Sequence, residues 1–195
     1  MNIVIIKYNA GNIRSVLFAL ERLGMKAVVS DDPEVIRAAD KVIFPGVGEA
    51  ASAMAYLREK ELDKLIVSLK QPVLGICLGL QLMCKHTEEG NTDCLGIFEQ
   101  QVKLFPPTEK VPQIGWNNIF NLKTTIFDRV SENAYVYFVH SYYAEIGQNT
   151  IATANYITPY SAALHKNNFY AMQYHPEKSG DVGEVMLRNF IELRD

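Results

Sequence analysis

A cysteine flanked by glycines stands where a predicted strand meets a predicted helix. The segment reads Gly75-Ile76-Cys77-Leu78-Gly79; it follows the apolar residues 72–74 and precedes the helix-like residues 80–83. This pattern predicts a nucleophile elbow, a tight strand-to-helix turn whose glycines leave room for neighbouring backbone. The sulfur would then lie at a helix N-terminus, where free N–H groups and the helix dipole favour a thiolate. The segment therefore points to covalent catalysis by Cys77.

A nucleophilic cysteine needs a base, and the base needs a group that orients it. His175 can be the base, and Glu177 follows it by two positions across the stiff residue Pro176. In an extended chain this spacing lets the carboxylate fold back on the imidazole and fix its tautomer. Taken alone, the two residues could equally belong to a surface loop. Beside a glycine-flanked cysteine, they predict a triad of Cys77, His175 and Glu177.

A thiolate that attacks a carbonyl group creates an oxyanion, which needs N–H donors. The N–H of Leu78, directly after the nucleophile, is one candidate. The other is the segment Gly46-Val47-Gly48, whose glycines let backbone approach a ligand closely. Val47 is the best single donor in this segment. The alternative is an ordinary strand-to-helix turn without a ligand.

Two further residues near the cysteine could bind substrate. Gln81 lies four positions after Cys77, so both project from one helix face. Gln81 could hold polar groups of a substrate or cap a neighbouring loop. Glu89 follows Glu88 in a polar stretch and could bind an α-amino group or belong to a solvated charge pair.

The other reactive residue types fit no known spacing. Cys84 and Cys94 lack flanking glycines and are predicted to be structural thiols, and with His86 they do not show zinc-site spacing, so no metal is expected. A serine-hydrolase role for Ser141, next to His140, would need Gly-x-Ser-x-Gly, which is absent. No Gly-x-Gly-x-x-Gly or phosphate-binding P-loop occurs, so nucleotide binding is not expected.

The first part of the chain alternates between strand-like and helix-like segments, which predicts a mostly parallel sheet with helices on both faces. Strands are expected at residues 3–6, 26–30, 42–44 and 73–76, and helices at 13–23, 33–39 and in one or two segments up to 69. The three unusual segments, 46–48, Cys77 and 175–177, each follow a predicted strand. Sites form where the chain leaves the carboxyl ends of parallel strands, so they meet if their strands are neighbours.

The second part changes to short β-like runs separated by turn residues, which predicts antiparallel strands added to the sheet or a small second sheet. The runs cover residues 101–104, 117–122, 134–139, 151–155, 162–165 and 169–173, and a final helix covers 182–193. No linker, repeat or low-complexity tract interrupts the chain, so residues 1–195 are expected to form one domain.

Composition and charge exclude several classes of protein. The chain has 195 residues, 48% of them hydrophobic, and a net charge of −3, which suggests neither a nucleic-acid nor a membrane surface. No apolar stretch is long enough to span a bilayer, and the N-terminus lacks the features of a signal peptide. Three cysteines, an odd number, are expected to be reduced thiols in the cytoplasm.

These motifs together resemble the triad-type (class I) glutamine amidotransferases, whose glutaminase domains use Cys, His and Glu. Within this family the chain is similar to the glutaminase subunits of imidazole glycerol phosphate synthases, and the likeness covers residues 3 to about 192. It rests on the segments beginning at Pro45, Gly75 and His175 together with residues 8–16, 112–117 and 138–143. Departures are Lys7, where the family commonly has an acidic residue, and Glu49-Ala50 in place of Ala-Phe.

The resemblance implies a flavodoxin-like sheet and a glutaminase that uses Cys77, His175 and Glu177, with no cofactor. It implies an oxyanion hole from Val47 and Leu78. Glutamine contacts are implied for the residues Gly46, Gly48, Gln81, Glu89, Ser141 and Tyr142. It also implies a heterodimer with a (β/α)₈-barrel cyclase subunit, which receives the ammonia without its release to solvent.

The partner gives a role to Trp116 and Asn117, which follow Pro112 and Gly115 and are expected on an ordered loop. An aromatic residue on such a loop is a common interface anchor, although a place in the core is the alternative.

Other functions stay open at this point. The chain could serve another synthase, such as one for anthranilate, pyridoxal phosphate or the amidation of surface sugars. It could also be a stand-alone cysteine hydrolase, or a silent module that only binds the cyclase.

Overall fold

The computed structural model describes residues 1–9 and 12–193. Its first part alternates strands and helices as expected. In chain order the elements are β1 (Ile3–Ile6), α1 (Ile13–Arg22), β2 (Ala27–Ser30), α2 (Pro33–Arg37), β3 (Lys41–Phe44), α3 (Ala50–Glu59), α4 (Leu62–Ser68), β4 (Val73–Ile76) and α5 (Leu78–Met83). Ala10 and Gly11, which belong to the segment 8–16 that carries part of the family resemblance, lie outside the described residues.

The second part is mostly β-structure and ends in a helix. The elements are β5 (His86–Thr87), the 3₁₀ turn η1 (Glu89–Asn91), β6 (Thr92–Asp93), β7 (Gln101–Leu104), β8 (Gln113–Ile119), η2 (Thr125–Phe127), β9 (Ala134–His140), β10 (Tyr142–Ala144), β11 (Thr150–Tyr156), β12 (Thr158–Lys166), β13 (Phe169–Met172), η3 (Pro176–Lys178) and α6 (Gly180–Glu192).

One large sheet connects the two parts. Its strand order is β2-β1-β3-β4-β13-β12-β10-β7-β5-β6, with β11 paired to β12. The strands β2, β1, β3, β4 and β13 are parallel, and the additions beyond β13 are largely antiparallel. Strands β8 and β9 form a separate antiparallel sheet. Both forms expected for the second part therefore occur together.

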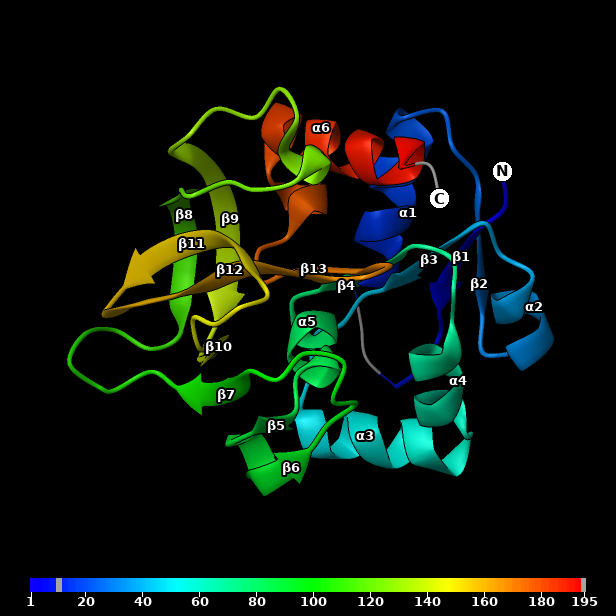
Figure 1. Ribbon diagram of the computed structural model, residues 1–195, viewed down its shortest axis with the longest axis horizontal. Coiled ribbons are helices and arrows are strands. Elements are labelled where there is room, and N and C mark those ends of the chain that lie inside the picture. The colour runs from blue at the N-terminus through cyan, green and yellow to red at the C-terminus, as the bar shows by residue number, and fades with distance from the viewer. Residues whose placement is uncertain (10–11, 194–195) are drawn as a thin grey trace.

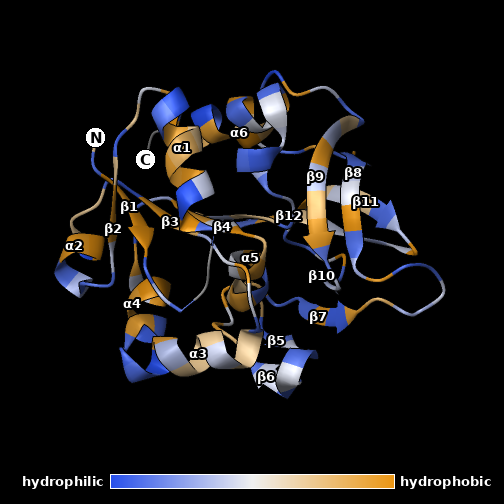
Figure 2. Ribbon diagram, turned by 180° about the vertical axis from the view of Figure 1, so that it is seen from behind, coloured by the Kyte–Doolittle hydropathy of each residue, from blue (hydrophilic) through white to orange (hydrophobic). Residues whose placement is uncertain are grey.

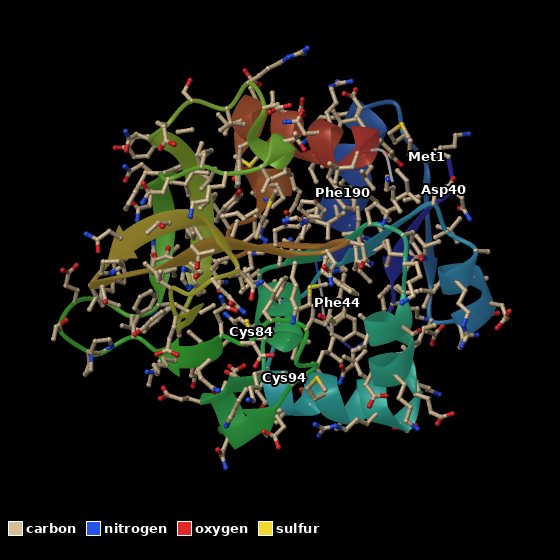
Figure 3. All side chains as sticks on the ribbon, in the orientation of Figure 1. Met1, Asp40, Phe44, Cys84, Cys94 and Phe190 are labelled. Carbon is tan, nitrogen blue, oxygen red and sulfur yellow. The ribbon has the colours of Figure 1, made fainter. Side chains whose placement is uncertain are left out.

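Helices cover both faces of the large sheet, as predicted. Figure 1 shows α1 and α6 on one side of the sheet and α3, α4 and α5 on the other. Each side has its own buried hydrophobic cluster, and Phe44 and Phe190 belong to opposite clusters (Figure 3). Strand β1 is hydrophobic throughout, whereas α1 and α4 alternate between hydrophobic and hydrophilic bands (Figure 2). Burial of apolar surface on both faces therefore accounts for the layered arrangement.

Local signals set several element ends. Asp32 accepts a hydrogen bond from the N–H of Glu34 at 2.8 Å, and Pro33 begins α2, so Asp32 caps this helix at its N-terminus. Glu49, one of the departures from the family pattern, caps α3 by accepting from the N–H groups of Ala51 and Ser52.

The predicted run 117–122 is shifted, because the strand is β8 at Gln113–Ile119, and Trp116 therefore lies on a strand rather than on a loop. The short strands β5, β6 and β10 had no counterpart in the prediction. Among residues 1–9 and 12–193, no helix is both long and apolar enough to cross a membrane.

Candidate active site

Three segments meet at the carboxyl ends of adjacent parallel strands. Strand β4 lies between β3 and β13 and pairs in parallel with both. The glycine segment 46–48 follows β3, Cys77 follows β4, and His175 lies three residues beyond β13. The expected neighbour relation of these strands is confirmed, and it brings the predicted triad to one edge of the sheet.

Cys77 occupies a sharp turn between β4 and α5. Its φ of 54° and ψ of −106° are strained for a residue with a side chain. Backbone hydrogen bonds hold this conformation: the Cys77 N–H donates to the Met172 carbonyl at 2.8 Å, and the Gln81 N–H donates to the Cys77 carbonyl at 3.3 Å. The turn is thus fixed by its neighbours on both sides, as a nucleophile elbow requires.

The glycines of this turn are needed for space. A Cβ at Gly79 would overlap the carbonyl oxygen of Phe44, and one at Gly75 would lie 2.9 Å from Sδ of Met83. A Cβ at Gly46 would overlap the hydroxyl of Tyr8, which donates to the Pro45 carbonyl at 2.6 Å. Close approach of neighbouring backbone and side-chain atoms, rather than a left-handed φ, therefore explains these three glycines.

His175 and Glu177 are buried and paired. Nδ1 of His175 lies 2.8 Å from Oε1 of Glu177, and a carboxylate can only accept, so Nδ1 carries the proton. Nε2 is buried and has no hydrogen-bond partner within the described part of the chain. Burial lowers the pKa of His175, but interactions with Cys77 and Glu177 outweigh this effect and raise the pKa to about 10. The imidazole is therefore oriented by Glu177 and held as a cation near the sulfur.

Asn12 also reaches this pair and was not singled out from the sequence. Its side-chain amide donates to Oε1 of Glu177, and its φ of 74° places it in the left-handed region. The side chain makes no capping hydrogen bond to α1, although Asn12 stands at the N-cap position. The contact joins residues 165 positions apart, and the segment around Asn12 has no local signal for it.

The sulfur of Cys77 faces a cavity of about 190 Å³. Its lining includes the segment residues Val47 and Gly48, the triad residue Cys77, and the predicted substrate-binding residues Gln81, Glu89, Ser141 and Tyr142. The structure therefore brings together residues that the sequence separates by more than 90 positions. Gly46 is absent from this lining and lies behind it, against Tyr8 and Leu78.

The two neighbouring glutamates differ in their surroundings. Glu89 is partly buried at the cavity and accepts from the N–H of Ala50 at 2.8 Å, whereas Glu88 accepts from the N–H of Leu104 at 2.7 Å. Burial raises the pKa of Glu89, the N–H of Ala50 lowers it, and the charge of Glu49 raises it further. Burial therefore disfavours the charged form of Glu89, and a cationic amino group in the cavity would stabilise that form. A solvent-exposed pair of glutamates would not need such a partner.

Leu78 is one of the two residues whose N–H groups are expected to bind the oxyanion. Its N–H is not free, because it donates to the carbonyl of Gly46 at 3.2 Å. The turn at Cys77 places this N–H next to the segment 46–48, which follows β3. Leu78 can therefore bind an oxyanion only after the Gly46 carbonyl turns away.

Gln81 is 5% exposed, and its side-chain amide donates to the carbonyl of Tyr142 at 3.0 Å and to Oε1 of Gln173 at 3.1 Å. Gln81 therefore lines the cavity and also holds the neighbouring strand β10, and its contact with a substrate stays a prediction. Gln173 is fully buried, and its Nε2 lies 3.7 Å from Sγ of Cys77. The sequence reasoning missed Gln173, although a residue two positions before His175 on an extended segment points to the same side.

His140, the neighbour of the rejected serine candidate, is buried beside the cavity. Its Nδ1 lies 2.7 Å from the carbonyl of Tyr142. Burial lowers the pKa of His140 to about 4, although this hydrogen bond opposes the effect and nearby His175 adds to it. His140 is thus neutral at neutral pH, and Nδ1 donates to the carbonyl.

The other two cysteines lie away from the triad, on the α3 side of the sheet (Figure 3). Burial raises the pKa of Cys84 well above its usual range and, as the largest effect, raises that of Cys94 to about 12. Both therefore remain protonated thiols.

Trp116 is 56% exposed on β8, which excludes the core alternative. Its ring meets that of Tyr137, the residue directly opposite on β9, edge to face at 6.0 Å between centroids. Asn117 points to the other face of β8, where its side-chain amide donates to the carbonyl of Asn155 at 3.1 Å. Trp116 therefore lies on an outer surface, and Asn117 instead joins β8 to β11.

The chain is similar to known proteins over almost its whole length. The model of the class I glutamine amidotransferase family matches residues 4–193. The imidazole glycerol phosphate synthase subunit HisH of Bacteroides fragilis strain YCH46 is 59% identical, and that of Escherichia coli K12 is 44% identical; each alignment covers 99% of this chain and 100% of the relative.

Two solved structures show the same fold at low sequence identity. A crystal structure described as a glutamine amidotransferase has a TM-score of 0.76 at 18% identity, with 97% of each chain covered. PurLQS from Thermotoga maritima has a TM-score of 0.69 at 15% identity, with 97% of each chain covered. With its elbow cysteine beside a histidine–glutamate pair and a family match over almost its whole length, the chain belongs to the class I glutamine amidotransferases.

Proposed function

We propose that this chain is the glutaminase subunit of an imidazole glycerol phosphate synthase. It hydrolyses L-glutamine to glutamate and ammonia, and a cyclase subunit uses the ammonia in L-histidine biosynthesis. The observation that carries the chemistry is Cys77 on a strained elbow beside His175, whose Nδ1 is held by Glu177 at 2.8 Å. The choice of synthase rests on the relatives named HisH, which match over the full chain.

In the first half of the reaction, Sγ of Cys77 attacks the side-chain amide carbon of glutamine. The carbonyl electrons move to oxygen, and the resulting oxyanion is stabilised by backbone N–H groups of Val47 and Leu78. His175, protonated at Nε2, gives that proton to the leaving nitrogen, and the C–N bond breaks to release ammonia. The enzyme is left as a glutamyl thioester on Cys77.

In the second half, a water molecule attacks the thioester carbon while the now neutral Nε2 of His175 accepts its proton. The C–S bond then breaks, glutamate leaves, and the thiolate–imidazolium pair is restored. Glu177 keeps the same ring nitrogen facing the sulfur throughout, because Nδ1 stays bound to its carboxylate. No cofactor is needed for either half.

The cavity fits a free amino acid. Its volume of about 190 Å³ is below the range of about 300 Å³ upward that is typical for drug-sized ligands, which favours a small substrate. In this proposal Glu89 binds the α-ammonium group, and Gln81, Ser141, Tyr142 and Gly48 contact the rest of the molecule, which is supported by their position in the cavity lining.

The engaged N–H of Leu78 predicts low activity for the isolated chain. The hydrogen bond from Leu78 to Gly46 closes one of the two proposed oxyanion donors. A partner that binds preferentially when the Gly46 carbonyl has turned away from Leu78 would increase the population of chains with a free Leu78 N–H. The rate of glutamine hydrolysis would then rise. The partner we propose is a (β/α)₈-barrel cyclase, and Trp116 is its proposed anchor on this subunit, because it is exposed beside Tyr137 on β9. A cytoplasmic location would keep the nucleophilic thiol reduced.

Purified chain is expected to hydrolyse glutamine at least about 10-fold faster once the cyclase and its ribonucleotide substrate are both added. The measurement is glutamate release, with the chain alone and with the cyclase alone as controls.

A Trp116→Ala variant should need a higher cyclase concentration for half-maximal stimulation, because a truncated anchor weakens association.

The other candidate functions give different results in the same assay. Stimulation by the synthase of the anthranilate or pyridoxal phosphate route, but not by the cyclase, would assign the chain to another pathway. Rapid hydrolysis of peptides or esters by the chain alone would indicate a stand-alone hydrolase. Failure of a glutamine-derived chloroketone to label Cys77 would support a silent module.

The pH dependence should reveal the role of Glu177. Because the pKa of His175 is raised to about 10, the proton for the leaving group is present at neutral pH and is lost only as pH rises toward 10. Replacing Glu177 by glutamine removes one of the charges that raise this pKa, so kcat/KM of the complex should fall at a pH lower by about one unit. The exposed Glu59→Gln is the control. An unchanged high-pH limit in Glu177→Gln would contradict the assignment.

A further inference from the structure

The side-chain amide of Gln173 lies between Cys77 and Gln81, two residues that line the cavity. Its side chain is fully buried, with Nε2 3.7 Å from Sγ of Cys77 and Oε1 3.1 Å from Nε2 of Gln81. Gln173 is the first residue after β13, and it lies on the same extended segment as His175. Its two polar ends thus connect Cys77 with Gln81.

The orientation of this amide follows from its neighbours. The Tyr142 carbonyl can only accept, so the Gln81 group 3.0 Å away must be its NH₂. The same NH₂ gives its second hydrogen toward Gln173, so Oε1 of Gln173 must face Gln81. The NH₂ of Gln173 is consequently turned toward the sulfur. The Tyr142 carbonyl therefore sets which end of each amide faces which way, through two successive hydrogen bonds.

The sulfur has two other kinds of neighbour in this pocket. The carbonyl of Val139 lies 3.8 Å from Sγ and can accept only from the protonated thiol. An N–H of Gln173 can donate to the thiolate, as can His175. Val139 and Gln173 thus favour opposite protonation states of Cys77, and the second is the reactive state.

We propose that Gln173 donates a hydrogen bond to the thiolate of Cys77 and couples it to Gln81. The proposal rests on the proposed function only in taking Cys77 as the nucleophile and Gln81 as a glutamine contact. Gln173 does two things here: its N–H stabilises the reactive sulfur anion, and its Oε1 fixes Gln81 at the cavity wall.

Two substitutions separate these roles. Gln173→Met has a similar length and removes both the N–H donor and the acceptor for Gln81. Gln173→Glu keeps an acceptor for Gln81 but places an oxygen instead of an N–H beside the sulfur. Gln100→Met is the matched control, because Gln100 is a buried amide, 6% exposed, that packs against Gly147 away from the cavity.

The test is the rate of Cys77 alkylation by iodoacetamide against pH, followed by peptide mass mapping on the full chain. Both Gln173 variants are expected to shift the midpoint of this profile upward by about one pH unit, because a donor to a charged atom is lost. Gln100→Met should keep the wild-type midpoint. Wild-type midpoints in both Gln173 variants, with folding verified by circular dichroism and thermal melting, would overturn the proposal.

Glutamine kinetics of the cyclase complex add a second readout. Gln173→Glu should lower kcat about tenfold with little change in KM, since the contact with Gln81 remains. Gln173→Met should lower kcat and also raise KM, and an unchanged KM would contradict the coupling to Gln81. The alkylation experiment needs neither glutamine nor cyclase, so a failure of the proposed function does not affect its result.

Discussion

Replacing Cys77 by alanine is expected to lower the glutamine-dependent rate of the cyclase complex by about 10⁴-fold or more. Without the sulfur no glutamyl thioester can form, and neither of the other triad members can replace the nucleophile. The same complex supplied with ammonium salt should make product at the wild-type rate, because the cyclase then needs no glutaminase. The measurement is product formation with glutamine and with ammonium in parallel.

A second cysteine provides the control for this experiment. Cys94 is partly exposed on the far side of the sheet from α1, and Cys94→Ala should retain both activities. Loss of the ammonium-dependent reaction in Cys77→Ala would mean that the substitution disturbs assembly of the two subunits. Retention of glutamine-dependent activity would exclude Cys77 as the nucleophile.

The second large effect is expected from Gly79→Ala, a change of one methyl group. The added Cβ would overlap the Phe44 carbonyl oxygen, which is backbone of β3 and cannot rotate away. The helix α5 must then move off β3, and we expect a loss of about 3 kcal/mol of unfolding free energy. For a chain of this size, that loss corresponds to a fall in Tm of roughly 6–12 °C.

The same displacement moves Cys77, which directly precedes α5. Glutaminase activity of the folded variant should fall by about 10²-fold, because a shift of about 1 Å at the nucleophile misaligns it with the amide carbon. Gly147→Ala is the matched control: its Cβ would meet only the end of the flexible Gln100 side chain. A Gly79→Ala protein with wild-type Tm and activity would show that the elbow tolerates a side chain.

The fold was predictable wherever the apolar pattern was local. The strands β1 and β4 have the bounds that their continuous apolar runs predicted, because burial on both faces leaves a clear pattern in sequence. The two-residue strands β5 and β6 are too short to show any periodicity. Strand β8 was displaced in the prediction because it combines polar residues, Gly115 and an exposed Trp116, which is atypical of a buried strand.

The residues of the candidate site also differ in how local their sequence signals are. The elbow around Cys77 and the pair formed by His175 and Glu177 are short-range patterns, so the sequence was sufficient to locate them. Gln173 and Asn12 contact residues 96 and 165 positions away, and the sequence has no local signal for either contact beyond the position of Gln173 two residues before His175. The hydrogen bond from the Leu78 N–H depends on the orientation of the Gly46 carbonyl, which cannot be read from the sequence.

The position of β13 between β4 and β12 has a consequence for how the protein is made. Cys77 leaves the ribosome almost a hundred residues before His175, and until Phe169–Met172 inserts beside β4 the sulfur has neither its imidazole nor the amide of Gln173. A nascent or truncated chain therefore carries an ordinary thiol. We therefore expect the reactive thiol to appear only once β13 has taken its place in the middle of the sheet.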